Sequence, residues 1–343
     1  MFSKVADFAR RHRKKLIFGG LVAGGMYAAH RYLSSLEENR QKIRKEIMDE
    51  MKRAEHFNSI LKTSDQSVLN LLETLRKKLD AELGVEEILE KVRAKPENRI
   101  FLWDEIKIRV LTYGLASVYA ESLLICALRT MMGIIGGYML ANSRRKSNQA
   151  NEVHSAYLNM LQNFLDKGVL EVIRVVKIHV LAAFGPIELK QVVTADDFLL
   201  GFNFVRTNVK IIENAPAYLM MDHWTPACTS QENPLSNSEI LNQLTSDTRD
   251  ILQCNDCQAV LERLIGSGFR DLNAIVTKAF GYVGDGKCHL VTLLPSLKTE
   301  IYKRDSGFVK ESLNSACSKD FLANVYEAFC NNPRDSCSQP KNS

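Results

Sequence analysis

The sequence of 343 residues is poor in several features that would point to other classes of protein. It has almost no segments with the alternating pattern of a β-strand, and it holds only 8 prolines and 2 tryptophans. Phosphate-binding glycine-rich loops, a dinucleotide-binding G-x-G-x-x-G after a strand, H-E-x-x-H and G-x-S-x-G are all absent. The 7 histidines form no spaced cluster. We therefore expect an all-α protein that is not an enzyme and needs no cofactor and no metal.

Signals for disulfides and glycosylation are also scarce. The 8 cysteines are scattered along a long chain, a pattern that suits free thiols in a reducing compartment better than a disulfide framework. No asparagine begins an N-x-[ST] acceptor sequence for N-glycosylation. Both absences place the large domain in the cytosol.

One cysteine pair has metal-like spacing, Cys254-Asn255-Asp256-Cys257, with Cys288-His289 about thirty residues later. A zinc site needs a second spaced pair, and two adjacent residues are poorly placed to supply it. A redox C-x-x-C of the thioredoxin type would need a βαβ context, which the sequence lacks. The simplest interpretation is two thiols around the start of a helix.

Basic residues are concentrated at the amino terminus. Residues 1–53 contain 13 Lys and Arg against 6 Asp and Glu, whereas the remaining 290 residues contain 32 against 34. The net charge of +5 is therefore an amino-terminal feature. It does not indicate a nucleic-acid-binding surface spread over the fold.

A basic segment (residues 1–15) precedes an apolar, glycine-rich stretch (16–33). A cleavable secretory signal, a mitochondrial presequence and a retained anchor are the possible interpretations. The stretch lacks a clear A-x-A cleavage site and is uniformly apolar rather than amphipathic, which favours a single transmembrane anchor. We expect a cytosolic helical-bundle domain over residues 34–330 and a polar tail over 331–343.

The longest apolar stretch, residues 100–140, organises the rest of the chain. Its core at 110–128 is long enough to cross a bilayer but carries Glu121 near its middle, which is costly in lipid. A helix that is apolar on nearly every side also suits the centre of a large soluble bundle. We favour the buried helix, with Glu121 paired to an Arg or Lys of a neighbouring helix.

Helical spacing recurs along most of the remaining chain. Thr63, Ser64 and Asp65 resemble an N-cap between a charged helix and one that ends at Gly84. Residues 215–238, with three prolines, form the longest irregular segment. The other expected helices are 85–94, the central helix from about residue 98, 153–184, 189–212, 238–253, 256–282, 289–303 and 306–330. Together they predict a large elongated bundle around one long central helix.

Four segments in this order resemble the peroxisomal biogenesis factor 3 (peroxin-3) family, membrane-anchored docking receptors for newly made peroxisomal membrane proteins. They are the basic run Arg11-His12-Arg13-Lys14-Lys15, Leu102-Trp103-Asp104-Glu105-Ile106-Lys107-Ile108 at the head of the central helix, Ile134-Ile135-Gly136-Gly137-Tyr138 near its end, and Asn324-Val325-Tyr326-Glu327-Ala328-Phe329. Their order and spacing fit over nearly the whole chain.

The resemblance implies that the basic run and the apolar stretch target the chain to the peroxisomal membrane, directly or through the endoplasmic reticulum. It also implies a groove that binds the amino-terminal amphipathic helix of the import chaperone peroxin-19, and so an indirect link to membrane-protein cargo but none to nucleic acid. By position, the groove residues are Trp103, Val92, Arg99, Ile106, Met139 and, in place of the family's groove-end lysine, Thr292. Lys298 is the second possibility for that last position. We expect Arg99 and Lys107 to give the rim of this groove a positive charge, suited to a helix with acidic edges.

A second hypothesis comes from a different class of protein. A membrane-tethered, lipid-handling protein or enzyme could use the apolar interior as a cavity. Binding of a helical peptide would favour the receptor, whereas a co-purified lipid or cofactor would favour the alternative.

Overall fold

The computed structural model describes residues 13–94, 97–141, 149–211, 234–283, 286–304 and 306–330. Within these ranges, the side chains of 13–30, 32–38, 149–154, 210–211 and 234–239 are not described. The chain divides into two units, residues 1–56 and 57–343. In the first unit the described residues belong to one helix, α2 (Arg13–Leu83), whose residues 39–55 are all exposed.

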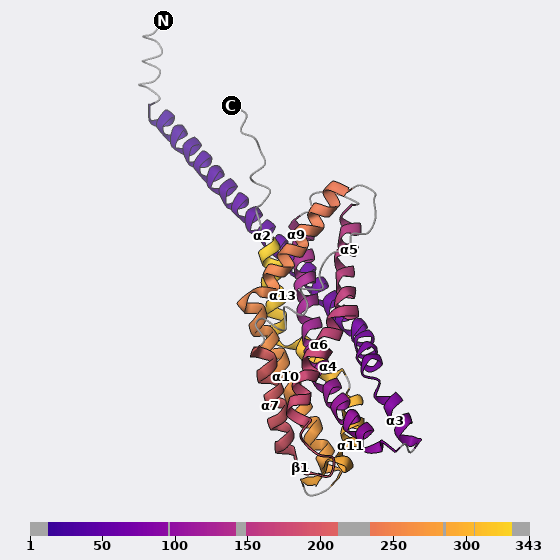
Figure 1. Ribbon diagram of the computed structural model, residues 1–343. Helices are drawn as coiled ribbons and strands as arrows, with labels where there is room; N and C mark the ends of the chain where they lie inside the picture. The colour runs from indigo at the N-terminus through magenta and orange to yellow at the C-terminus, as the bar shows by residue number, and fades with distance from the viewer. Residues whose placement is uncertain are drawn as a thin grey trace. The chain divides into compact units, whose positions relative to one another are not determined.

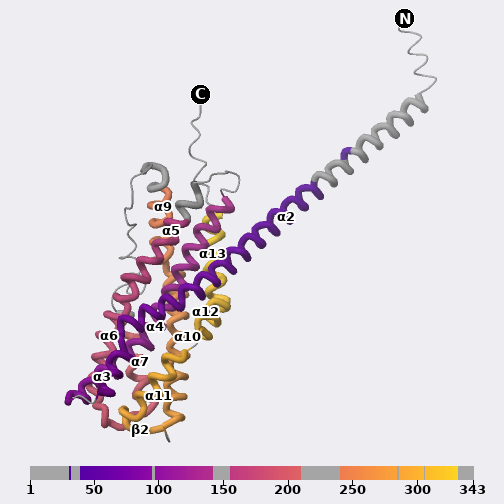
Figure 2. Tube along the Cα trace, turned by 90° about the vertical axis from the view of Figure 1, so that its right-hand side faces the viewer, coloured from indigo at the N-terminus to yellow at the C-terminus, as the bar shows by residue number. Residues whose placement is uncertain are grey.

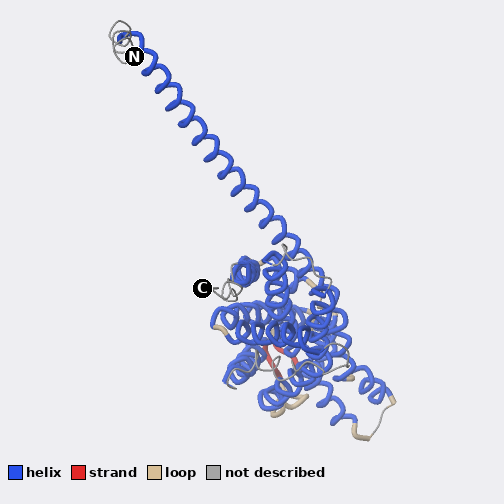
Figure 3. The backbone as a smooth tube through the Cα atoms, turned by 90° about the horizontal axis from the view of Figure 1, so that it is seen from above, coloured by secondary structure: helices blue, strands red, loops and turns tan. Residues whose placement is uncertain are grey.

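Helices make up nearly all of the described part of the second unit, as the all-α prediction requires (Figure 3). After α2 they are α3 (Val85–Arg93), α4 (Arg99–Ala141), α5 (Gln149–Asn163), the π-helix η1 (Phe164–Gly168), α6 (Val169–Phe184), α7 (Ala195–Ile211), α9 (Pro234–Gln253), α10 (Asn255–Gly281), α11 (Leu290–Tyr302), α12 (Gly307–Asn314) and α13 (Ala316–Cys330).

The central position of α4 is confirmed. Every residue from Val110 to Gly137 is buried, and α13, α6, α10 and α3 all pack against this helix (Figure 1). Among the described residues, α4 is also the helix long and apolar enough to span a bilayer, but 83% of its most apolar window is buried inside the protein. The anchor expected at 16–33 lies in α2 but outside the residues whose side chains are described.

The part of α2 that belongs to the second unit, residues 57–83, runs antiparallel along α4. Three contacts fix the direction: Ile60 lies against Gly136, Asp65 pairs with Arg129, and Arg76 pairs with Glu121. As the residue number rises on α2, the number of its partner on α4 falls. Gly84 then ends α2 in the left-handed region at φ 51°, which only glycine adopts without strain, so α3 starts in a new direction.

Several predicted boundaries were wrong. Thr63, Ser64 and Asp65 lie inside α2, where the Thr63 hydroxyl donates to the Ser59 carbonyl and Asp65 pairs with Arg129. The predicted helix 153–184 begins earlier and contains η1, and the predicted helix 306–330 is broken at Ser315. The described chain also forms two short antiparallel strands, β1 (Val192–Thr194) and β2 (Lys287–His289). The sequence did not predict them, because strands of three residues are too short to show an alternating pattern. Residues 215–233 of the expected irregular segment and the tail 331–343 lie outside the described residues.

Three glycines explain why α13 approaches α4 so closely. A Cβ atom at Gly137 would lie 2.6 Å from the Phe329 Cβ atom and 2.8 Å from the Tyr326 carbonyl oxygen. Gly133 is similarly crowded by Val325 of α13, and Gly136 by Ile60 of α2 and, less closely, by Tyr326 of α13. The Gly-Gly pair in the sequence is therefore a packing requirement: the absence of side chains allows two helices to contact through their backbones.

Gly137→Ala is expected to lower the free energy of unfolding by about 1–3 kcal/mol, the usual cost of an added methyl group in a tightly packed interior. Backbone atoms of α13 supply part of the crowding, so a side-chain rotation cannot relieve it. Urea unfolding followed by far-ultraviolet circular dichroism measures the change. The matched control is Gly281→Ala at the end of α10, where nothing lies within 4 Å of the new atom. Equal stability of the two variants would contradict the packing argument.

Candidate interaction site at the start of the central helix

The amino-terminal end of α4 packs against α3. Helix α3 buries Val85, Ile88 and Val92, and α4 buries Leu102 and Ile106, so that the two helices pack on each other. The views in Figure 1 and Figure 2 place α3, α11 and the short strands at this same end of the bundle.

Large apolar side chains remain uncovered in the first turns of α4. Ile100 is 70% exposed and Phe101 is 65% exposed, and Trp103 is half-buried with one side packed against the core. We name Ile100 and Trp103, which lie on the same side of α4 at positions i and i+3, the α4-start patch; Phe101 is on a different side of the helix. Sequence reasoning identified Trp103 but missed Ile100 and Phe101, although two large apolar residues before the buried run were a visible signal.

The charges beside this patch differ from those expected. Arg99 is exposed, as a basic rim requires. Lys107 is buried, however, and its ammonium group donates to the Asp104 carboxylate at 3.0 Å and to the Ile187 carbonyl at 2.7 Å. Lys107 therefore anchors the segment after α6 to α4 and contributes no charge to the rim.

The residues named for the groove do not all lie together. Val92, Arg99, Trp103 and Ile106 belong to the packed pair α3–α4 at this end, with Val92 and Ile106 buried beneath the surface. Met139 is 44% exposed but lies 36 residues after Trp103 on α4, which is about 54 Å at the rise of an α-helix. It lies at the other end of α4.

Thr292 lies at the same end of the bundle as Trp103, although on a different helix. It is exposed near the start of α11, and the neighbouring Val291 N–H donates to the Leu189 carbonyl. Ile187, two residues before Leu189, accepts the hydrogen bond from Lys107. Lys298, the second possibility, pairs with Glu86 of α3 and thereby joins α11 to α3.

Glu121, the charge that made a membrane span costly, has two partners. Its carboxylate pairs with Arg76 of α2 at 2.8 Å and with Arg304, which follows α11, at 3.1 Å. Arg304 also pairs with Asp271 of α10 at 2.6 Å. The expected pairing with a neighbouring basic residue is confirmed, and the network ties three helices together. The Glu121 carboxylate itself is completely buried within this network.

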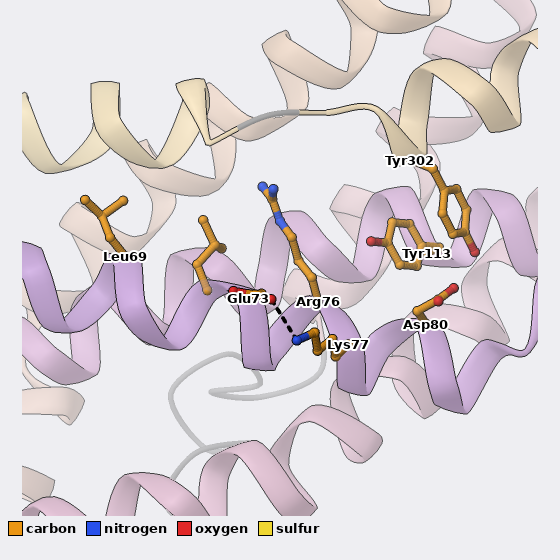
Figure 4. Close-up of a pocket in the computed structure, with 8 residues that line it drawn as sticks. Leu69, Glu73, Arg76, Lys77, Asp80, Tyr113 and Tyr302 are labelled. Atoms are coloured by element: carbon orange, nitrogen blue, oxygen red, sulfur yellow. Dashed lines mark ion pairs between the residues drawn. The ribbon is translucent and has the colours of Figure 1, made fainter.

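A cavity of about 350 Å³ is lined in part by Arg76, a member of this network (Figure 4). Tyr113 and Tyr302 stack there at 4.2 Å between ring centroids, and Glu73, Lys77 and Asp80 line the cavity on α2. Burial raises the pKa of both phenols, so both stay protonated at physiological pH. A second cavity of similar volume is lined by Glu82, Arg109, Arg174, Lys177 and three apolar residues. Neither includes the α4-start patch.

The Cys254–Cys257 pair lies at a helix start, as expected. Cys254 is the N-cap of α10, and its sulfur accepts a hydrogen bond from the Cys257 N–H at 3.4 Å. Within the described part of the chain, no group of three or more His, Cys, Asp or Glu residues is arranged to hold a metal ion.

Comparison with known proteins extends the resemblance over the chain. A family model described as Peroxin-3 matches residues 7–100 and 137–287, so Val92, Arg99 and Met139 lie in matched segments while Trp103 and Ile106 lie between them. "Peroxisomal biogenesis factor 3" of Rattus norvegicus is 30% identical over 365 residues, which cover 96% of this chain and 98% of the relative. The Homo sapiens protein of the same name is 28% identical over 369 residues with the same coverage. "Peroxisome biogenesis protein 3-2" of Arabidopsis thaliana is 26% identical over 156 residues, 41% of this chain and 43% of the relative. This chain belongs to the Peroxin-3 family.

Proposed function

We propose that this chain is a docking receptor of the peroxisomal membrane that binds peroxin-19 and so brings newly made membrane proteins to the organelle. The observation that carries the proposal is family membership over almost the full length: relatives named for peroxisome biogenesis align with 96% of the chain. Non-enzymatic biogenesis factors make up this family, in agreement with the absence of catalytic motifs from the sequence.

The α4-start patch supports the location of the binding site. An amphipathic helix binds in a groove through apolar side chains at i, i+3, i+4 and i+7. Ile100 and Trp103 offer apolar surface for such side chains, and Arg99 can face an acidic edge of the partner. Trp103 is well suited as the principal contact because its inner side is held by the core while its outer side remains available.

Titration calorimetry with the amino-terminal peptide of peroxin-19 tests the receptor assignment. We expect one peptide to bind per chain, and a scrambled peptide of the same composition to give no heat of binding. A chain that is folded by circular dichroism but does not bind the native peptide would contradict the proposal.

We propose further that residues 16–33 anchor the chain in the membrane and that the basic run Arg11-His12-Arg13-Lys14-Lys15 takes part in targeting. Arg11 and His12 lie outside the described residues, so the sequence is the support here: a basic run followed by an apolar stretch. The burial of α4 removes the other long apolar helix of the described chain from consideration as a span.

Deletion of residues 1–33 is expected to give a soluble, helical protein that no longer resides in membranes. Alkaline carbonate extraction followed by centrifugation measures this, with the intact chain as control. Recovery of the truncated chain in the membrane pellet would show that a second segment inserts, and would contradict the assignment of α4 to a soluble core.

The lipid-handling alternative requires an apolar cavity. The two cavities described above each hold about 350 Å³ and each contain at least four charged side chains. Such linings are poorly suited to an acyl chain, because charged groups lose hydration when they are covered by hydrocarbon. These observations favour the receptor.

A further inference from the structure

Several cysteines that are far apart in sequence meet at the amino terminus of α10. Cys254 and Cys257 come from α10 itself, and Cys126 comes from the buried middle of α4. Cys317, near the start of α13, lies close enough to Cys126 to affect its ionisation. The docking function proposed above makes no use of these thiols.

Cys254 and Cys257 occupy different environments on one helical turn. Cys254 precedes the helix in an extended conformation, φ −69° and ψ 152°, and is half-exposed. Cys257 is only 1% exposed. The Cys254 sulfur lies over the first turn, because it accepts the Cys257 N–H at 3.4 Å. A surface thiol is thus held beside a buried one, the arrangement that proteins with a C-x-x-C at a helix start use for disulfide exchange.

The third thiol, that of Cys126, lies on the buried side of the Cys254–Cys257 pair. Cys126 is 1% exposed and is a buried neighbour of the Cys257 thiol. The neighbouring Cys257 thiol, together with burial, raises the pKa of Cys126 well above its usual value. Cys126 therefore stays protonated, and its contact orients Cys257 between the surface thiol and the core.

We propose that Cys254 and Cys257 form a reversible disulfide when a small hydroperoxide oxidises Cys254. Cys254 is the accessible thiol and reacts first, and Cys257 is the resolving thiol. Residues three apart on a helical turn have Cβ atoms about 5–6 Å apart, whereas a disulfide needs about 3.5–4.5 Å. Because Cys254 is the cap and not an interior residue, a small rotation of its backbone closes the difference without breaking the helix.

The chemistry balances with hydrogen peroxide as the oxidant. The Cys254 sulfur attacks one peroxide oxygen and gives up its proton; the O–O bond breaks, and the departing hydroxide takes that proton to give water. The resulting sulfenic acid is attacked by the Cys257 sulfur. The S–S bond forms, the S–O bond breaks, and the second hydroxide leaves with the Cys257 proton as water. Two thiols and one peroxide give one disulfide and two waters, and a dithiol reductant reverses the reaction.

Mass spectrometry of the full-length chain tests the proposal directly, because trypsin places both cysteines in one peptide, residues 250–263, that contains no other cysteine. After treatment with hydrogen peroxide and capping of the remaining thiols, we expect this peptide to lose two hydrogens and both capping groups. Dithiothreitol should restore both. The half-exposed Cys288 in β2 is the matched reference thiol and should be oxidised at least tenfold more slowly.

Two single variants assign the roles. In Cys254→Ser, serine preserves the N-cap of the helix. The Cys257 thiol of this variant should remain unoxidised, and so available for labelling, at least tenfold longer in peroxide, because Cys257 is buried. In Cys257→Ser, oxidation of Cys254 should stop at a sulfenic acid that dimedone traps. Oxidation of Cys254 no faster than that of Cys288 would overturn the proposal. A cross-linked peptide joining Cys126 to Cys257 would overturn it as well, because the buried pair would then be the reactive one.

Discussion

Trp103→Ala is expected to weaken binding of the peroxin-19 amino-terminal helix by roughly thirty-fold or more. Truncation of a tryptophan at the centre of an interface commonly costs about 2–4 kcal/mol of binding free energy, and about 1.4 kcal/mol corresponds to tenfold. Trp103 has the exposure that such a role requires: its outer side is free while its inner side contacts the core. Because Leu102 and Ile106 make the buried contacts on either side, the fold should survive the change.

The measurement pairs titration calorimetry with thermal unfolding of the same samples. Some loss of stability is expected, but less than the roughly 3–5 kcal/mol that follows truncation of a fully buried tryptophan. Phe204→Ala is the matched control, because Phe204 is a 45% exposed aromatic residue on α7, outside the α4-start patch. Unchanged affinity in the folded fraction of Trp103→Ala would show that Trp103 is a core residue only, and the binding site would have to lie elsewhere.

Glu121→Ala should lower the free energy of unfolding by about 3–5 kcal/mol, the usual cost of removing one partner from a buried ion pair. The Glu121 carboxylate is completely buried, and the Arg304 side chain is only 6% exposed. Without the carboxylate, the Arg304 guanidinium keeps Asp271 as its charged partner and the Ser117 hydroxyl as an acceptor, and Arg76 loses the acceptor of two hydrogen bonds. Urea unfolding of the variant and the parent chain measures the difference.

Two further variants separate charge from shape. Glu121→Gln preserves the volume and one acceptor oxygen, so its loss of stability should fall between those of the parent and the alanine variant. Glu73→Ala removes an exposed acid that pairs with Lys77 on the same helix, and it should leave stability essentially unchanged. If Glu121→Ala were as stable as the parent, the network would not hold α2, α4 and α10 together.

The sequence alone determined the helical class, the buried central helix, the end of α2 at Gly84, the start of α3 and the position of Cys254 before a helix. These features depend on local information: apolar residues at helical spacing, a glycine that tolerates a positive φ, and a run of residues that is apolar on every side. The basic amino terminus followed by an apolar stretch is equally local. Family membership was also visible, because it rests on the order of short segments.

Tertiary structure decided what depends on contacts between distant residues. The packed structure determines that Arg76 and Arg304 are the partners of Glu121. It also determines that α2 continues through Thr63, because packing along α4 outweighs a local capping preference. It buried Lys107, which the sequence placed on the rim of the groove. It also brought Cys126 to Cys257 across 131 positions of sequence. Helical periodicity shows which face of a helix is apolar, but only the packed bundle determines which other helix that face meets.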